Sequence, residues 1–425
     1  MDLDKSLKKL YSLHTFGIKL GLDNISKFLD YLGNPQKELR AFHIAGSNGK
    51  GSTTAFIASI LMELNCKVGM YTSPHFVKFN ERIKINNFEI PDYYISGFIS
   101  DYEKYIDENQ VTFFEATTAM AFKYFLEQNV EYAVIETGLG GRLDATNILD
   151  PLAAVITTIS LEHTHVLGNT IKEVAGEKAG IIKNGLKVFT GKLPPDAEKV
   201  FEEKCKNLGC ELFKLKDYIN ESENSLVLLP AGMQPERIEL DDRTIPLTGY
   251  HQKYNAALAG LTVSKTLAFD NLDFMRKGIK NILINTGFQG RYEFYRKNPD
   301  IIFDSAHNPE GIRSFINEFK KNDKNYSKRI LLFGVMRDKA VKEMLLDIRS
   351  YFDEVYITEI DNERTCKIED LLKISSDINL KVKVENDPVK LLENFEAGTK
   401  NECLVVLGSM YLIGAIKLKL TNIIT

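Results

Sequence analysis

The sequence has little of what marks secreted, membrane-spanning or nucleic-acid-binding proteins. Its five cysteines include no C-x-x-C pair, which argues against a disulfide framework or a structural zinc site. No stretch approaches the roughly 18 apolar residues of a membrane-spanning helix, and the N-terminus lacks the layout of a secretion signal. A net charge of -4 with a pI near 6.1 offers no basic surplus for nucleic acid. We expect a cytoplasmic protein with neither nucleic-acid nor membrane partners.

The chain is too long for one ordinary hydrophobic core. It has 425 residues, of which 44% are hydrophobic and 26% are charged, a composition typical of globular proteins. Length alone predicts two domains or slightly more. We find no internal repeat and no low-complexity segment.

The segment AGSNGKGS, residues 45–52, resembles a phosphate-binding loop but departs from the usual G-x-x-x-x-G-K-[ST] pattern twice. Ile44 stands where the pattern has glycine, and Gly51 follows Lys50, so that the hydroxyl arrives one residue late as Ser52. The preceding run 39–45 has the length of a strand, and residues 52–65 carry apolar side chains at the spacing of one helix face. The sequence therefore predicts a glycine-rich turn between a strand and a helix.

Such a turn suits an oligophosphate. Its backbone N–H groups and the positive end of the following helix point at one spot. Lys50 adds a point charge, and Ser52 or Thr53 can reach a magnesium ion. The simpler alternative is an ordinary tight turn that contains a lysine, which leaves the combination of glycines, lysine and hydroxyls without a purpose.

Three further apolar runs predict strands of the same sheet. They are residues 67–72, 132–135 and 153–159, and polar residues follow each of them: Ser73, Glu136 and His163. Apolar runs that alternate with helical patterns predict a parallel sheet covered on both faces. Ligands of such sheets bind outside the carboxyl ends of the strands, so we expect these three side chains near the phosphate loop.

A second α/β pattern begins near residue 301. It contains four strand-like runs, IIFDSAHN, RILLFGVM, DEVYITEI and ECLVVLGS, separated by helical stretches. The segment NTGFQGR, residues 285–291, carries two glycines and no periodicity. We predict an α/β protein with an N-terminal P-loop-type, parallel-sheet ATP-binding domain (1–285), a hinge (286–292) and a smaller Rossmann-like C-terminal domain (293–425). A ligand site between two such domains would close by their relative motion.

Nine ordered segments resemble the folylpolyglutamate synthases of the Mur ligase superfamily, and more closely the bifunctional dihydrofolate synthase/folylpolyglutamate synthases. The resemblance covers the chain nearly end to end. It rests on GSNGKGSTT, YTSPHFVKFNERI, FFEATTAMAF, ETGLGGRLDATN, HTHVLG, GEKAGI, HQKYNAALA, GRYEF and FDSAHNPEG. Loops of the AGTNGKGS type occur in this family, so the late hydroxyl is the family's own variant.

The resemblance implies an ATP-dependent acid–amino-acid ligase. In the family the γ-phosphoryl group of ATP is transferred to the carboxylate of pteroate or folate, and the amine of L-glutamate attacks the resulting acyl phosphate. Phosphorylation removes the charge and the poor leaving group that protect a carboxylate. Catalysis of this kind depends mainly on positioning and charge stabilisation, to which magnesium contributes.

The resemblance also implies roles for individual residues. Catalytic roles fall to Lys50, His163 and Lys178, and magnesium ligands, for two ions, are Ser52, Ser73, Glu136, His163 and Lys178. Lys178 matches a lysine that the family carries as a carbamate, which would turn its cation into an oxygen ligand. ATP is held by Ser47, Asn48, Gly49, Lys50, Gly51, Ser52, Asn255, Arg291, Asp304 and His307. Taken singly, each of these residues also fits an ordinary turn, cap or solvated charge.

For the pterin substrate, the matching residues are Ile18, Lys19, Leu20, Pro74, His75, Thr112, Phe113, Phe114, Glu115, Leu143, Asp144 and Ala145. Phe114 can stack on a flat ring, and a carboxylate can accept its N–H donors; core packing is the alternative for the phenylalanine. The segment RLDA, residues 142–145, resembles the corresponding segment of the enzymes that also accept dihydropteroate, which favours both activities. One departure is Glu162, which stands before His163 where many relatives have aspartate. The family's folate enzymes often act as monomers, and we expect a monomer.

Two rival functions fit part of the pattern. Superfamily ligases that build cell-wall peptide usually carry an additional N-terminal domain, for which the roughly forty residues before the phosphate loop leave no room. A nucleotide-dependent switch ATPase would need a strand-end acid for magnesium and an arginine from a partner. Glu136 and Arg291 can imitate these, but this function leaves the folate-like segments unexplained.

Overall fold

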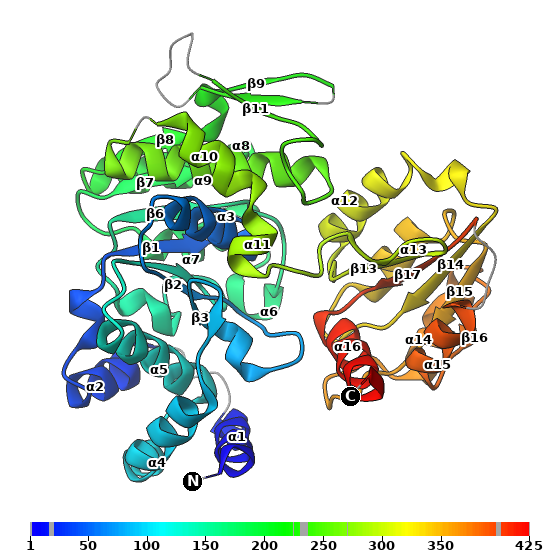
Figure 1. Ribbon diagram of the computed structural model, residues 1–425, viewed down its shortest axis with the longest axis horizontal. Helices are drawn as coiled ribbons and strands as arrows, with labels where there is room; N and C mark the ends of the chain where they lie inside the picture. Colours follow the sequence, from blue (N-terminus) through cyan, green and yellow to red (C-terminus); the bar gives the residue numbers. More distant parts are fainter. Residues whose placement is uncertain are drawn as a thin grey trace. The chain divides into compact units, whose positions relative to one another are not determined.

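The computed structural model describes residues 2–16, 21–223, 225–229, 237–269, 271–396 and 401–424. The chain divides into two compact units. Unit 1 comprises Met1–Pro74, Phe79–Pro246 and Gln252–Phe288, and unit 2 comprises His75–Lys78, Leu247–His251 and Gln289–Thr425. Each unit is built around its own sheet (Figure 1).

Unit 1 contains an eight-stranded sheet in the order β4-β3-β2-β5-β1-β6-β7-β8. The six strands from β2 to β8 run parallel, while β3 and β4 are antiparallel additions at one edge. The strands are β1 (Ala41–Ala45), β2 (Val68–Tyr71), β3 (Ile83–Ile85), β4 (Phe88–Glu89), β5 (Tyr132–Glu136), β6 (Ala153–Ile156), β7 (Lys187–Thr190) and β8 (Glu211–Lys214).

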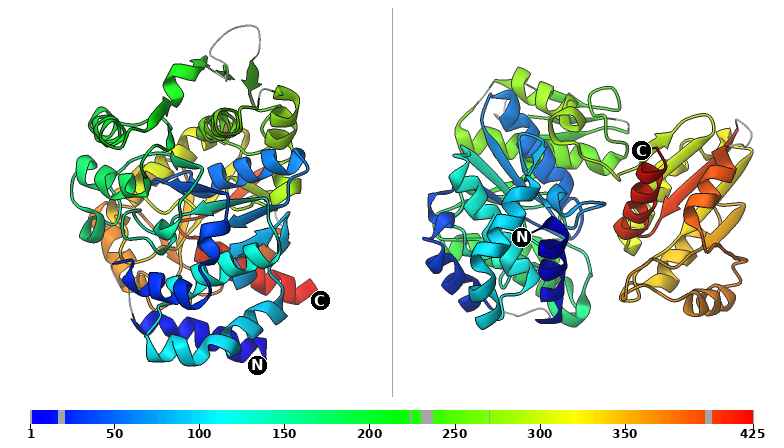
Figure 2. Two further views of the ribbon diagram at one scale, coloured as in Figure 1. Left: turned by 90° about the vertical axis from the view of Figure 1, so that its left-hand side faces the viewer. Right: turned by 60° about the horizontal axis from the view of Figure 1, so that its bottom comes forward.

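Helices cover both faces of this sheet. One face packs against α1, α2, α4, α5, α7 and α8, with α1 lying along α4 (Figure 2), and α3 packs on β1, β2 and β5 and is covered by α10 and α11. The helices are α1 (Leu3–Ser12), α2 (Asp23–Tyr31), α3 (Lys50–Glu63), α4 (Asp92–Glu108), α5 (Phe113–Glu127), α6 (Thr164–Leu167), α7 (Ile171–Lys178), α8 (Pro195–Asn207), α9 (Tyr250–Leu267), α10 (Leu272–Lys280) and α11 (Ile282–Thr286). Helix α3 is buried nearly all round, which fits its position between sheet and helices.

Short elements complete unit 1. A three-stranded antiparallel sheet lies at its rim (Figure 1) and consists of β9 (Ile219–Glu221), β10 (Leu226–Leu228) and β11 (Ile238–Leu240). The 3₁₀ helices of this unit are η1 (Leu13–Phe16), η2 (Pro35–Glu38), η3 (Phe79–Arg82), η4 (Ala145–Ile148), η5 (Ala179–Ile181) and η6 (Leu215–Tyr218).

Unit 2 contains a six-stranded sheet in the order β12-β13-β17-β14-β15-β16, in which only β12 is antiparallel. The strands are β12 (Glu293–Arg296), β13 (Asp300–Asp304), β14 (Lys328–Phe333), β15 (Glu354–Ile357), β16 (Lys383–Val384) and β17 (Glu402–Leu407). Apolar side chains of α12 (Pro309–Phe319), α13 (Val341–Ile348) and α14 (Ile368–Asp377) cover one face. Those of α15 (Pro388–Glu396) and α16 (Met410–Ile424) cover the other, and η7 spans Asp323–Asn325.

The segment His75–Lys78 packs into unit 2 although its neighbours in sequence belong to unit 1. A Cβ added to Gly414 would lie 1.8 Å from the backbone oxygen of Phe76, and one added to Gly290 would lie 2.2 Å from the Phe76 ring. Because Gly290 and Gly414 carry no side chain, they leave the space that Phe76 occupies.

The structure confirms the predicted α/β class and the four predicted strands of the second sheet, to which it adds β12 and β16. Several predicted boundaries were wrong by one to three residues, and two of them concern the phosphate loop. Helix α3 begins at Lys50 rather than Ser52, and β6 ends at Ile156 rather than Ile159. Beyond Ile156, the hydroxyls of Thr157 and Thr158 bond to the phosphate loop, as described below. Within the described residues no helix is long and apolar enough to cross a membrane.

Candidate functional site

The loop between β1 and α3 depends on two glycines. Gly46 has φ of +152°, and a Cβ there would lie 1.8 Å from Oγ1 of Thr157. Gly49 has φ of +85°, and a Cβ there would lie 2.5 Å from Oδ1 of Asn255. Side-chain-bearing residues would therefore meet both strain and a clash. The same contact places Asn255, on α9, directly against the loop.

Side chains beyond β6 hold the loop in shape. Thr158 accepts a hydrogen bond from Asn48 N at Oγ1 (2.9 Å), and Thr157 Oγ1 donates to Asn48 O (2.6 Å). Ser47 N donates to Thr158 O (2.8 Å), and its hydroxyl accepts from Ser160 N (3.0 Å). The residues that follow β6 thus hold the loop in one shape, as binding of phosphate through backbone N–H groups requires.

Lys50 is the first residue of α3, and Gly51 and Ser52 complete the opening of the helix. The Lys50 ammonium donates hydrogen bonds to Gly46 O (2.8 Å) and Ser47 O (3.1 Å). The charge therefore lies over the loop itself, where it can meet an anion that the loop binds. Ser52 is buried in the first turn.

Glu136 and Ser73 meet beside the same helix end. The Glu136 carboxylate is 4% exposed and accepts a hydrogen bond from Ser73 N (3.1 Å). Its two oxygens lie 3.7 and 3.8 Å from the position of a Cβ on Gly51. The ends of β2 and β5 thus bring a carboxylate and a serine to the opening of α3, as the sheet topology predicts.

Lys178, at the end of α7, is tied to the other side of the loop. Its ammonium is 1% exposed and donates to Gly46 O (2.9 Å) and to Glu162 Oε1 (2.7 Å). His163 follows Glu162 in a left-handed conformation, with φ of 45°, and precedes the short helix α6. The segments after β1 and β6 and the end of α7 thus converge on Gly46.

Burial and pairing shift the pKa values of both Glu162 and Lys178. Burial would raise the pKa of the Glu162 carboxyl, but the charges of Lys178 and Lys50 outweigh it and lower that pKa to about 2. Burial lowers the pKa of Lys178 to about 8 despite the attraction of Glu162. A lysine with a lowered pKa loses its proton more readily and is more nucleophilic near neutral pH.

The residues predicted for the pterin side lie around the start of α5. Thr112 caps this helix and forms a capping box with Glu115, whose Oε2 accepts from Thr112 N (2.8 Å) and Asn24 Nδ2 (2.8 Å). Phe113 is buried and stacks on His14, with ring centroids 4.1 Å apart. Phe114 is half-buried, and a Cβ added to Gly138 would lie 2.4 Å from its ring. Phe114 therefore lies against the loop that follows Glu136.

Ile18, Lys19 and Leu20 lie outside the described residues. Leu143 is half-buried, and Asp144 and Ala145 are buried at the start of η4. Pro74 ends the first segment of unit 1, whereas His75 belongs to unit 2. The predicted substrate residues are therefore divided between the two units.

Three predicted nucleotide residues lie in unit 2. Asp304 ends β13 and accepts hydrogen bonds from Tyr292 N (2.7 Å) and Ala306 N (2.8 Å); burial raises its pKa, and the Arg291 guanidinium opposes that rise. His307 is held through Nδ1 at 2.9 Å from Ser305 O. Arg291, Asp304 and His307 thus gather at the carboxyl end of β13, and Ser409 follows the neighbouring strand β17.

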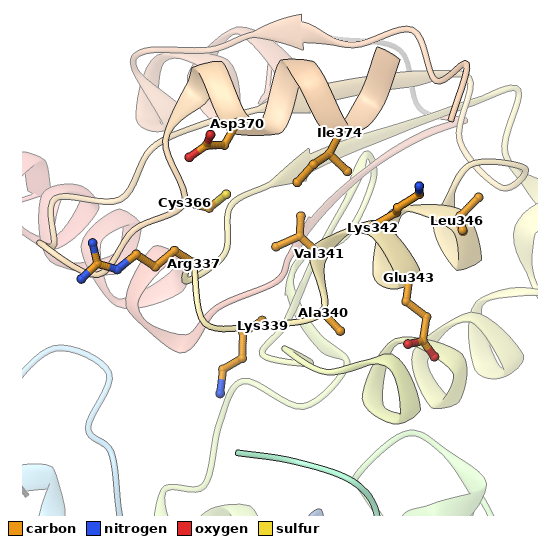
Figure 3. Close-up of a pocket in the computed structure, with 10 residues that line it drawn as sticks. All are labelled: Arg337, Lys339, Ala340, Val341, Lys342, Glu343, Leu346, Cys366, Asp370 and Ile374. Carbon is orange, nitrogen blue, oxygen red and sulfur yellow. The ribbon is translucent and has the colours of Figure 1, made fainter. Parts of the chain in front are cut away.

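A cavity of about 610 Å³ in unit 2 is lined by residues that follow the end of β14 and by the first turns of two helices (Figure 3). It opens between α13 and α14, with Val341 and Ile374 facing each other across it and Arg337, Lys339 and Lys342 around it. A second cavity, of about 500 Å³, lies between β11 and α10 in unit 1. No predicted site residue lines either cavity. The predicted site is instead built around the phosphate loop, and a bound ligand would complete the surface of that site.

Sequence reasoning missed several polar residues that shape the site. The apolar run predicts a strand at Thr157 and Thr158, and Glu162 after that run carries no predicted contact with Lys178. The available signal was the segment TTISLEHTH, in which polar residues follow the apolar run of a buried strand, where ligands of parallel sheets bind. Buried His43, within β1, gave no signal at all.

Comparison with known proteins finds two family models that together match most of the chain. Residues 44–263 match the model of the Mur ligase middle domain, and residues 290–410 match that of the Mur ligase glutamate ligase domain. The chain is 35% identical over 423 residues to the dihydrofolate synthase/folylpolyglutamate synthase of Bacillus subtilis (strain 168), covering 95% of this chain and 96% of that protein.

Solved structures share the whole fold. The complex of E. coli FolC with DHPP and ADP superposes with a TM-score of 0.86 at 26% identity, covering 100% of this chain and 99% of the other. The folylpolyglutamate synthase of Thermotoga maritima superposes with a TM-score of 0.82 at 30% identity, covering 98% and 97%.

Proposed function

The chain belongs to the folylpolyglutamate synthase branch of the Mur ligase family, and we propose that it joins L-glutamate to folates and to dihydropteroate with conversion of ATP to ADP and phosphate. The observation that carries this proposal is the convergence on one loop of Lys50, Glu136 with Ser73, and Lys178 with Glu162. An oligophosphate on this loop meets cations, a carboxylate and hydroxyls at once. That combination is suited to phosphoryl transfer.

The reaction has two steps. A carboxylate oxygen of the pteroate or folate attacks the γ-phosphorus of ATP, the bond to the bridging oxygen breaks, and ADP leaves. The amine of glutamate then attacks the acyl carbon, phosphate departs with the C–O bonding electrons, and the amine loses a proton to give the amide. No oxidant or reductant is needed, and the chain has to bind, align and stabilise charge.

The backbone of residues 47–51 cradles the phosphates, and Lys50 moves from its loop carbonyls to the γ-phosphoryl oxygens. Its present partners, Gly46 O and Ser47 O, lie in the loop that would bind the phosphates. As negative charge shifts onto the departing ADP, the ammonium and the N–H groups stabilise it. Asn255, which contacts the loop at Gly49, supports the nucleotide from α9. Nucleotide contacts for Arg291, Asp304 and His307 stay predictions.

The donor set fits magnesium. Glu136, Ser73 and Ser52 offer oxygen atoms beside the loop, and this hard cation prefers oxygen ligands. Within the described part of the chain no three His, Cys, Asp or Glu side chains form a metal site of their own. Magnesium sites that use substrate phosphates commonly need only one or two protein carboxylates, together with water. Magnesium would neutralise charge on the transferred phosphoryl group.

A second magnesium ion, bound by His163 and a carbamate on Lys178, is the finer part of this proposal. The support is that Lys178 is buried beside the loop and that its pKa is lowered to about 8 by burial. A neutral amine is the form that reacts with carbon dioxide. The monomeric state and the cytoplasmic location stay predictions from the sequence.

The experiment combines purified protein, magnesium-ATP and L-glutamate with dihydropteroate or a reduced folate. Phosphate release is expected only when the pterin acceptor is present, and mass spectrometry should show the acceptor gaining one glutamyl unit. Phosphate release that ignores the acceptor would contradict the ligase function and favour a nucleotide-dependent switch.

A further inference from the structure

Two side chains from distant parts of the chain border Gly51, the residue that follows Lys50. A Cβ added to Gly51 would lie 3.6 Å from Cε2 of Phe288 and 3.7 and 3.8 Å from the two carboxylate oxygens of Glu136. Glu136 is buried, Phe288 is half-buried, and all of these residues belong to unit 1. Where the usual phosphate-loop pattern has a hydroxyl-bearing residue, this chain therefore has a glycine bordered by a carboxylate and an aromatic ring.

Helix α11, which precedes Phe288, is fastened along α3 (Figure 1). Asn281 and Asn285 each donate a hydrogen bond from Nδ2 to Oε1 of Glu63 (2.8 and 2.9 Å), and Asn285 Nδ2 also donates to Oγ of Ser59 (3.0 Å). The Ser59 hydroxyl itself donates to Gly278 O (2.6 Å) on α10. Because Glu63 ends α3 and Ser59 lies one turn earlier, successive residues of α11 approach the end of α3 that opens at the phosphate loop.

The hairpin of β3 and β4 caps the end of α11. Lys84 Nζ donates to Thr286 O (3.1 Å), and Asn87 Nδ2 donates to Ile284 O (3.1 Å). The last carbonyls of a helix need such donors. Gly287 ends the helix with φ of +62°, and a Cβ there would lie 2.8 Å from Oδ1 of Asn87. The position of the residue after Gly287 is therefore set by contacts with both α3 and the hairpin.

The ring of Phe288 gives the Glu136 carboxylate an apolar neighbour. Ser73 N donates to Oε2 of the same carboxylate (3.1 Å), so both a hydrogen-bond donor and a ring border it. The apolar surroundings of a metal site restrict the access of water and lower the local dielectric. A carboxylate attracts a cation more strongly where the dielectric is lower. Phe288 can therefore strengthen the binding of magnesium without being a ligand.

We propose that Phe288 is a positioning residue for magnesium-ATP, whose ring borders the Glu136 carboxylate at the opening of α3 and keeps water from it. The ring acts through Glu136 and Gly51 and does not contact the reacting atoms. The fastened course of α11 and the turn at Gly287 bring it to this position. The inference rests on the proposed function for the metal and the nucleotide, whereas the contacts of the ring do not depend on that function.

The decisive variant is Phe288→Ala, which removes the ring. Phe288→Leu keeps an apolar side chain at the same position and should retain most of the effect. Ile284→Ala is the matched control, because it also shortens an apolar side chain near the end of α11, but one that is 76% exposed. Asn285→Ala leaves the ring in place and removes the hydrogen bonds that fasten α11 to Ser59 and Glu63.

The measurement is calorimetric titration of each protein with ADP, once with magnesium and once with a chelator in its place. ADP needs no acceptor and undergoes no turnover. Phe288→Ala should weaken the binding of magnesium-ADP about tenfold, while the affinity for metal-free ADP changes less than threefold. Phe288→Leu should stay within threefold of the wild type in both titrations, and Ile284→Ala should match it. Asn285→Ala should weaken magnesium-ADP binding in the same direction by a smaller factor.

Two results would overturn the proposal. One is an unchanged affinity for magnesium-ADP in Phe288→Ala, or in Asn285→Ala if Phe288→Ala does not fold. The other is an equal loss of affinity with and without magnesium, which would assign the ring to the nucleotide rather than to the metal site. A wild-type protein without acceptor-dependent turnover would contradict the proposed function, and the ADP titrations would still decide the role of Phe288.

Discussion

The carboxyl edges of the two parallel sheets are built in different ways. In unit 1, the edge joins groups that are far apart in sequence, such as Gly46 with Lys178 and Ser73 with Glu136. In unit 2, Asp304, His307 and Asn308 bond to neighbours between residues 292 and 311. The first edge places buried charges around a loop, whereas the second is a locally closed turn. We infer that mutations at the first edge impair chemistry and that loss of the Asn308 cap at the second impairs local stability. The nucleotide contacts of Arg291, Asp304 and His307 stay predictions.

The largest expected effect separates the two edges by activity. Lys50→Ala removes the cation above the phosphate loop, and loss of such charge stabilisation should lower turnover by about 10³-fold. Phosphate release with saturating substrates measures it. Lys199→Ala, an exposed lysine of α8, is the matched control and should retain wild-type turnover. Comparable rates in the two variants would remove Lys50 from the catalytic assignment.

The second prediction tests whether the buried pair of Glu162 and Lys178 at the first edge stabilises the protein through its charges. Glu162→Gln leaves the Lys178 ammonium without its partner and should cost about 3 kcal/mol of unfolding free energy at pH 7 in metal-free protein. The Glu162 pKa is lowered to about 2 because Lys178 and Lys50 outweigh burial. The stabilisation is therefore present above pH 4.5 and is lost as the pH falls toward 2.

Denaturant unfolding of both proteins from pH 7 downward tests this window. The difference in unfolding free energy between wild type and Glu162→Gln should become smaller below pH 4.5. A difference that stays constant with pH would show that the pair contributes through packing rather than charge.

The third effect concerns the proposed carbamate. Lys178→Ala should reduce turnover by about 10²-fold, as expected for loss of one group that stabilises the transferred phosphoryl. Formate or acetate at high concentration should restore part of the rate, because a small carboxylate can supply the oxygen ligand. Loss of activity that no carboxylate relieves would favour a purely structural role for Lys178.

The smallest expected effect is a loss of stability in unit 2, at the N-terminal cap of α12. Asn308 caps α12 by accepting a hydrogen bond from Gly311 N (2.7 Å). Asn308→Ala should therefore cost about 1 kcal/mol of stability, seen as a lower thermal midpoint, while Asn308→Asp keeps the cap. Equal midpoints for Ala and Asp variants would show that the local turn does not depend on this cap.

The sequence predicted a large part of the site because strand ends can be located from apolar runs. Ser73, Glu136 and the AGSNGKGS turn follow such runs, and the parallel topology brings them to one edge. The family resemblance supplied Lys178 and Asn255, which local patterns do not single out. The contacts Lys178–Glu162 and His43–Thr146 were not predicted, since each joins elements whose relative position no local pattern encodes.

By itself, the sequence determined the α/β class, the strands and the phosphate loop, because apolar periodicity and glycine placement act over a few residues. Only the tertiary structure decided which polar groups are satisfied and which remain available for ligands. Lys178 illustrates the difference: its residue type suits a solvated surface, but its ammonium is buried against Glu162 and Gly46 O. A buried charge must find partners wherever the fold brings them, and those partners lie on other segments of the chain.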